Sequence, residues 1–121
     1  HIDRIDALNP VMIELSYEPM GEYGISGRRF FRKGGEVNRS HHVHAYESTN
    51  PEVKKHLDFR DYLIAHSAEA RQYGELKKEL ALKFPHDIEG YIEGKGAFVK
   101  EIIRRAAEWR EIQTYKTSDA L

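Results

Sequence analysis

The chain has 121 residues, of which 40% are hydrophobic and 32% charged, and its formal net charge at pH 7 is −1. This composition is typical of one folded domain and excludes a disordered chain, and so small a net charge excludes a global field that attracts nucleic acid or a membrane. The sequence contains no cysteine, which excludes disulfides, cysteine zinc sites and thiol nucleophiles and is compatible with the cytoplasmic location that we expect.

The first part of the chain predicts two short helices and a short strand. Apolar residues follow a helical spacing from Ile5 to Leu15. Pro10 interrupts this spacing, and Asn9 as an N-cap followed by Pro10 predicts a division into two short helices. A turn into a short strand is expected over residues 16–20, and the glycines that follow predict a turn-rich connection.

Two predicted strands then form a hairpin. Residues 28–33 and 40–47 are rich in aromatic or alternating residues, and residues 34–38 supply glycine and asparagine for the turn between them. Alternation of side chains along the second strand places three residues on one face, namely His42, His44 and Tyr46.

The remainder of the chain is expected to be helical. Asn50 and Pro51 are typical of the start of a helix, here over residues 51–66, and Ser67 is expected to cap a second helix over residues 68–84. The prediction continues with a short helix over 88–93, a break at Gly94-Lys95-Gly96, a last helix to about Trp109 and a frayed polar tail from Gln113. The buried stripes of the two longer helices are expected to be Tyr73, Leu76, Leu80 and Phe84, and Phe98, Ile102, Ala106 and Trp109.

The strand over residues 28–33 carries four basic side chains. Alternation places Arg28 and Arg32 on one face. Arg29 and Lys33 lie on the other face. Guanidinium groups bind phosphate through paired hydrogen bonds, and a strand holds them at a fixed spacing. The cluster therefore predicts a phosphate-binding surface, with basic protection of a sheet edge against aggregation as the alternative.

Two further cations lie in the predicted helices. A helical wheel places Arg60 near the centre of the apolar arc of residues 53–64, where an arginine requires a partner. We expect an internal salt bridge, for instance to Asp61, with a ligand anion or solvent as the alternatives. Lys95, at the expected start of the last helix, predicts an anion-binding position or, alternatively, a flexible turn. The carboxylates of these helices, Asp58 among them, are expected on solvated faces.

His42 and His44 are two residues apart on a strand, so their imidazoles point the same way and are able to chelate a transition metal. Two imidazoles do not complete a metal site, and a third ligand has to come from elsewhere. The alternative is that both are ordinary histidines of the sheet, one of them hydrogen-bonded in a pocket.

Five motifs occur in a fixed order along the chain. They are GRRFFRKG over residues 27–34, HHVH over 41–44, FRDYL over 59–63, ELKKEL over 75–80 and YIEGK over 91–95. In this order, from about Asp6 to Trp109, they resemble the GrpB family.

The resemblance implies an α+β nucleotidyltransferase-like fold, a mixed sheet with flanking helices, over residues 1–112. It also implies nucleotidyl transfer in a full-length parent, with Mg or Mn as the cofactor and a nucleotide triphosphate or another phosphate-bearing small molecule as the ligand. By the same resemblance Arg28, Arg29 and Arg32 face the phosphates, His42 and His44 line the cleft, and Arg60 and Lys95 are pocket groups.

The chain departs from the family pattern before His1, where a Gly-Ser-Thr-Ala-Val-Pro-Gly loop and an acidic strand are expected. We therefore expect a fragment of a longer protein, inactive alone, or association of a second copy with the incomplete sheet. A non-catalytic phosphate-binding domain is the alternative function, and a histidine metal site unrelated to nucleotides is a third.

Overall fold

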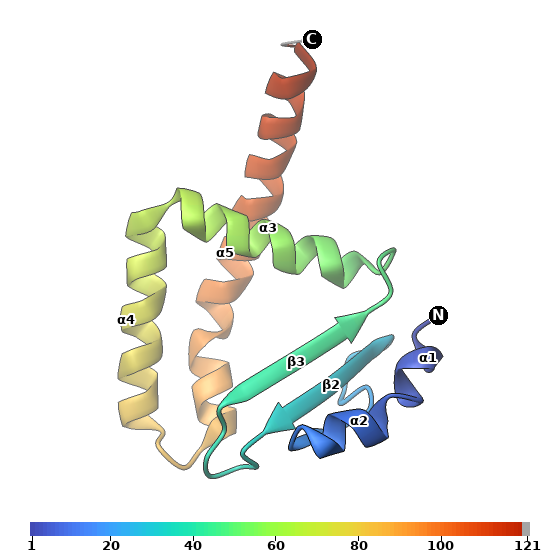
Figure 1. Ribbon diagram of the computed structural model, residues 1–121. Coiled ribbons are helices and arrows are strands. Elements are labelled where there is room, and N and C mark those ends of the chain that lie inside the picture. Colours follow the sequence, from blue (N-terminus) through green and yellow to red (C-terminus); the bar gives the residue numbers. More distant parts are fainter. Residues whose placement is uncertain (120–121) are drawn as a thin grey trace. The chain divides into compact units, whose positions relative to one another are not determined.

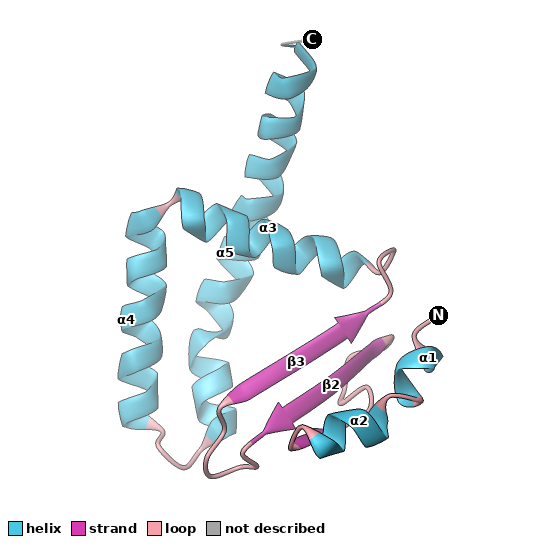
Figure 2. Cartoon of the chain, in the orientation of Figure 1, coloured by secondary structure: helices cyan, strands magenta, loops and turns pink. Residues whose placement is uncertain are grey.

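The computed structural model describes residues 1–119, which form five helices and three strands (Figures 1 and 2). Contacts group the chain into two compact units, His1–Val53 and Lys54–Leu121. The first, here called the sheet unit, contains α1 (Asp3–Asp6), α2 (Asn9–Glu14), β1 (Tyr17–Pro19), β2 (Arg28–Lys33) and β3 (His41–Tyr46). The second, the helical unit, contains most of α3 (Pro51–Ala65), with α4 (Ser67–Lys83) and α5 (Ile88–Asp119). The single domain expected over residues 1–112 stays a prediction. Among the helices of residues 1–119, none has the length and apolarity of a membrane-spanning segment.

The sheet contains the predicted hairpin of β2 and β3. β2 lies between β1 and β3, and both pairings are antiparallel. The mixed sheet implied by the resemblance is therefore wrong for residues 1–119. The connections over residues 20–27 and 34–40 are too short for the crossover that parallel neighbours require. β1 and β3 are the edges of this sheet, and association of a second copy with an edge stays a prediction.

Two short helices precede the sheet, as predicted. Asn9 is the first residue of α2 rather than its cap, and Leu8 occupies the cap position. Pro10 lies in the first turn, where its missing N–H has no helical partner to lose. α1 is attached to the sheet through Arg29, whose Nε donates to Oδ1 of Asp6 at 2.7 Å.

The predicted apolar stripes of α4 and α5 are confirmed in part, because Leu80, Ile102 and Ala106 are buried and the other five residues are half-buried. Ile102 and Ala106 of α5 are buried together with Tyr62 of α3. In α4, Leu80 is buried and the ring of Tyr73 stacks on Phe98 at 5.6 Å between centroids. Other partly buried residues complete this core, namely Phe59, Leu63 and Trp109.

The orientation predicted for α3 is wrong. Its buried residues are Asp58 and Tyr62, whereas Ile64 is 76% exposed and the side chain of Arg60 extends into solvent. The reason is an ion pair across the helices, in which Nε of Arg110 donates to Oδ1 of Asp58 at 2.9 Å. A helical wheel based on hydrophobicity predicts that Asp58 faces solvent. It takes no account of an ion-pair partner in another helix, here Arg110.

α5 continues without interruption from Ile88 to Asp119. The break predicted at residues 94–96 and the frayed tail predicted from Gln113 are therefore wrong over the described residues. Gly94 packs closely against α4, because a Cβ added there would lie 2.4 Å from Cδ2 of Leu80. This glycine is required by helix packing rather than by a turn.

Acidification is expected to weaken the helical unit through Glu101. Its carboxylate accepts hydrogen bonds from Arg104 at 2.7 Å and Arg105 at 2.9 Å. These bonds lower the pKa of Glu101 from 4.5 to about 2. In the unfolded chain the carboxylate of Glu101 binds a proton more readily than in the folded chain. The stabilisation that Glu101 contributes is therefore complete above pH 4.5 and is lost as the pH falls towards 2.

Urea unfolding at a series of pH values tests this expectation. The difference in unfolding free energy between wild type and Glu101→Gln should shrink as the pH falls from 4.5 towards 2. Glu111→Gln, an exposed change on the same helix, should keep the wild-type pH dependence. A Glu101→Gln variant with the acid dependence of wild type would contradict the assignment.

Candidate functional site

The candidate site is one face of the sheet, formed by Arg28, Phe30 and Arg32 of β2 with His42 and His44 of β3, and it is called the Arg28 face below. The ring centroid of Phe30 lies 5.3 Å from that of His42 and 5.1 Å from that of His44. The guanidinium carbon of Arg28 lies 4.9 Å from the centroid of the Phe30 ring. These contacts, and the register that pairs Arg32 with His42, place the two arginines and the two histidines on one face.

Arg28 is the most enclosed cation of this face, with 6% of its surface exposed. Its Nε donates to the carbonyl of Glu22 at 3.1 Å and its Nη2 to the carbonyl of Tyr23 at 2.7 Å. Its Nη1 lies 3.2 Å from Nδ1 of His44. Because a guanidinium only donates, a hydrogen bond between these two groups requires this nitrogen of His44 to accept.

The guanidinium of Arg28 therefore has neutral partners only. Within residues 1–119 no carboxylate lies within ion-pairing distance of it. A guanidinium has five N–H donors, and three of those of Arg28 are used in these hydrogen bonds. The other two have no protein acceptor in this part of the chain. The site thus contains a nearly buried positive charge that the described residues do not neutralise.

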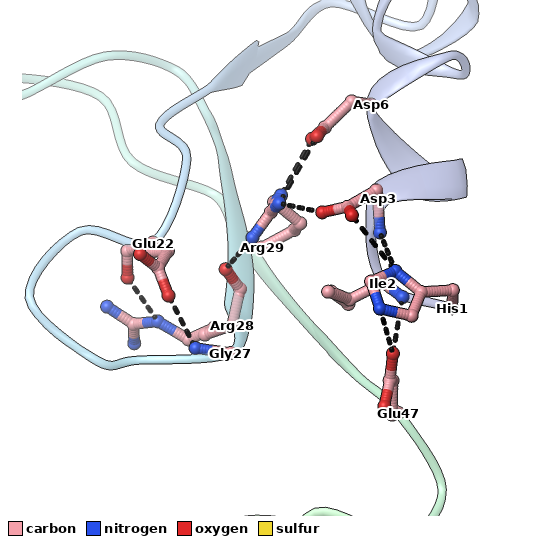
Figure 3. Close-up of polar contacts among 9 residues, drawn as sticks. All are labelled: His1, Ile2, Asp3, Asp6, Glu22, Gly27, Arg28, Arg29 and Glu47. Atoms are coloured by element: carbon pink, nitrogen blue, oxygen red, sulfur yellow. Dashed lines mark hydrogen bonds and ion pairs between the residues drawn. The ribbon is translucent and has the colours of Figure 1, made fainter.

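The two carbonyls at Arg28 come from the connection between β1 and β2. Tyr23 has a φ of 46° and Gly27 a φ of 78°, so the backbone passes through the left-handed region in the middle of the connection and again at its end. This path directs the carbonyl of Glu22 toward the guanidinium (Figure 3). The carbonyl of Tyr23 also accepts a hydrogen bond from it. The glycines predicted a turn here, but a backbone carbonyl has no residue-specific signal in a sequence.

The other two arginines of β2 are already paired with carboxylates. Arg29 lies on the opposite face, with its Nε 2.7 Å from Asp6 and its Nη2 3.2 Å from Asp3 (Figure 3). Arg32 shares the Arg28 face, with its Nε 2.8 Å from Glu18. Hydrogen bonds from these guanidinium groups lower the pKa of Asp6 and of Glu18. The three predicted phosphate ligands therefore do not converge, and Arg29 points away from the other two.

Arg60 and Lys95 belong to the helical unit. Arg60 pairs with Asp61, its Nη2 2.8 Å from Oδ1, but the pair lies at the surface, where 61% of the Arg60 side chain is exposed, so the internal salt bridge that was expected is wrong. Lys95 lies inside α5, so its predicted position at a helix start is wrong. Its Nζ lies 4.9 Å from the centroid of the Tyr91 ring. Phosphate binding by Arg60 and by Lys95 stays a prediction.

The described residues do not fit the divalent metal implied by the resemblance. His42 and His44 share a face and a ring contact with Phe30. Magnesium and manganese prefer oxygen ligands, and a protein site for either requires several. In residues 1–119 no group of three or more histidines and carboxylates is placed to hold a metal ion.

Comparison with known proteins shows the family of this chain. The family model of the GrpB protein matches residues 1–105. The chain is 44% identical over 110 residues to the UPF0157 protein YqkA of Bacillus subtilis, an alignment that covers 91% of this chain and 32% of YqkA. It is 33% identical over 98 residues to the glutamate-rich protein GrpB of Alkalihalophilus pseudofirmus, covering 78% of this chain and 56% of that protein.

A crystal structure of the conserved protein GrpB from Enterococcus faecalis has a similar α+β fold, with a TM-score of 0.82 and 42% identity. The alignment covers 91% of this chain and 66% of that structure. The chain thus spans 32% to 66% of the length of these relatives. Because the family model matches all but the last 16 of the 121 residues (121 − 105), the chain belongs to the GrpB family.

Proposed function

We propose that the Arg28 face binds a phosphate-type oxyanion, with Arg28 as the principal ligand. The observation that carries this proposal is the nearly buried guanidinium, which contacts two carbonyls and an imidazole but no carboxylate in residues 1–119. An uncompensated charge away from water is unfavourable. An anion at the two remaining N–H groups would compensate it.

Phosphate matches this site better than a single-atom anion does. A guanidinium presents its N–H groups as a planar fork, which pairs with two oxygens of one phosphate group. Arg32 adds a second positive group on the same face, although Glu18 already accepts a hydrogen bond from it. We therefore propose a nucleotide triphosphate or another phosphate-bearing small molecule as the ligand.

Nucleotidyl transfer by the longer GrpB proteins is the finer proposal that the family resemblance suggests. Such transfer requires carboxylates that hold divalent metal beside the triphosphate. Residues 1–119 provide no group of metal ligands of that size. We accordingly assign binding, and no step of transfer, to the residues of this chain.

Isothermal titration calorimetry of the 121-residue chain with ATP and with inorganic tripolyphosphate tests the proposal. Arg28→Gln should weaken binding by roughly 10- to 100-fold, because hydrogen bonds to charged groups contribute about 1.5–3 kcal/mol. Arg28→Lys keeps the charge but loses the fork, and its affinity should lie between those of wild type and Arg28→Gln.

The matched control is Arg29→Gln, which removes the same charge from the adjacent residue on the opposite face. It should bind both ligands as tightly as wild type. Circular dichroism establishes that each variant is folded, since Arg28 also holds the connection before β2. Equal weakening in Arg28→Gln and Arg29→Gln, or a wild-type chain that binds neither ligand, would refute the proposal.

A further inference from the structure

Two lysines of the helical unit lie at the same level of adjacent helices. The antiparallel packing of α4 and α5 places Gly94 against Leu80, and the ring of Phe98 stacks on that of Tyr73. Lys95 follows Gly94 and precedes Phe98, while Lys77 lies between Tyr73 and Leu80. The two contacts therefore bracket both lysines at one level of the helix pair. The close approach at Gly94 brings the two helix backbones together at this point.

Neither ammonium group is neutralised by the part of the chain that the structure describes. Nζ of Lys77 lies 4.4 Å from the centroid of the Tyr73 ring, and Nζ of Lys95 lies 4.9 Å from that of the Tyr91 ring. No carboxylate of residues 1–119 forms an ion pair with either. Both lysines are half-buried. Burial, and then the charge of Lys77, lower the pKa of Lys95.

We propose that Lys77 and Lys95 form a second oxyanion site, on the helical unit, for a multivalent phosphate-type anion. Two like charges at one level of a helix pair repel each other, and the tyrosine rings offset only part of this repulsion. An anion that contacts both ammonium groups replaces the repulsion with two attractive interactions. Lysine binds phosphate as a point charge, so no fork geometry is required here.

This inference gives a function to the Gly94-Lys95-Gly96 sequence, which is neither a turn nor a helix start. Gly94 provides the close helix contact, and Lys95 provides the cation that the contact brings to Lys77. The site lies in the helical unit and shares no residue with the Arg28 face. Anion binding at this second site therefore does not depend on anion binding at the Arg28 face.

Lysine acetylation footprinting of the intact chain tests the second site. The chain is treated with acetic anhydride at neutral pH, with and without inorganic tripolyphosphate, and the modification of each lysine is followed by mass spectrometry. Bound anion should raise the pKa of Lys95 and slow its acetylation by about tenfold for each unit of that rise. Lys77 should be protected in parallel. ATP in place of tripolyphosphate distinguishes a nucleotide source of the phosphate from a free polyphosphate.

The controls separate this site from the surface and from the Arg28 face. Lys78, the exposed neighbour of Lys77 on α4, should be acetylated equally with and without the anion. Lys77→Gln should abolish protection of Lys95, whereas Arg28→Gln should leave it unchanged. The inference would be overturned if Lys78 were protected as strongly as Lys95, or if Lys95 were not protected in wild type. Protection of Lys95 that persists in Lys77→Gln would also overturn it.

Discussion

Replacing Ile102 with alanine should lower the free energy of unfolding by about 3–4 kcal/mol, because the truncation leaves a cavity in a packed core as well as removing apolar contacts. Ile102 is 1% exposed and lies with Tyr62 and Ala106 at the centre of the helical unit. Side chains from α3 and α5 surround the cavity that this substitution would leave, so the helices cannot readily move to fill it. The loss is a large fraction of the roughly 5–15 kcal/mol that stabilises a typical domain.

Urea unfolding measures this loss, and the fluorescence of the single tryptophan, Trp109, reports on the same core. Ile112→Ala removes the same atoms from the same helix at a position that is 54% exposed. It should change the unfolding free energy by about 0.5 kcal/mol or less. Similar losses in the two variants would contradict the position of Ile102 in the core.

Gly34→Ala should destabilise the sheet unit by about 2–4 kcal/mol, because backbone strain and a steric clash occur together. Gly34 has a φ of 90°, which L residues rarely adopt. A Cβ added there would lie 1.8 Å from the carbonyl oxygen of Asn38. The clash involves backbone rather than a mobile side chain, so only opening of the turn between β2 and β3 relieves it.

Gly35→Ala is the matched control for this turn. Gly35 also has a positive φ, of 64°, but an added Cβ would meet nothing within 4 Å. Its cost should be only about 1–2 kcal/mol, the cost of the left-handed conformation. Thermal unfolding by circular dichroism compares the two variants, and an equal loss would show that the turn does not hold the close approach at Asn38. Because the hairpin aligns Phe30 with His44, Gly34→Ala should also weaken oxyanion binding at the Arg28 face.

Patterns that depend on neighbouring residues predicted much of the fold. Alternation correctly placed Arg28 and Arg32 on one face of β2 and the two histidines on one face of β3, and the register of the strands then brings both pairs to the same face. The strand pattern and the turn residues between 34 and 38 predicted the antiparallel hairpin. Helical spacing identified the buried stripe around Ile102 in α5. Each of these features follows from a period of two or of 3.6 residues, which the sequence displays directly.

Features that depend on contacts between distant residues were not predictable in this way. Asp58 is buried because Arg110, 52 residues later, pairs with it. Gly94 lies inside a continuous helix because Leu80 of another helix packs against it. In both cases the residue type alone suggested a solvated carboxylate or a break in the helix.

The candidate site shows the same division. The sequence by itself determined that three arginines lie along one strand and that Arg28 and Arg32 share a face. Only the tertiary structure decided which of them has a carboxylate partner, because Asp6 and Glu18 reach Arg29 and Arg32 whereas backbone carbonyls and His44 surround Arg28. The physical reason is that alternation is a local property of a strand, whereas neutralisation of a charge depends on which groups the folded chain brings within a few ångströms of it.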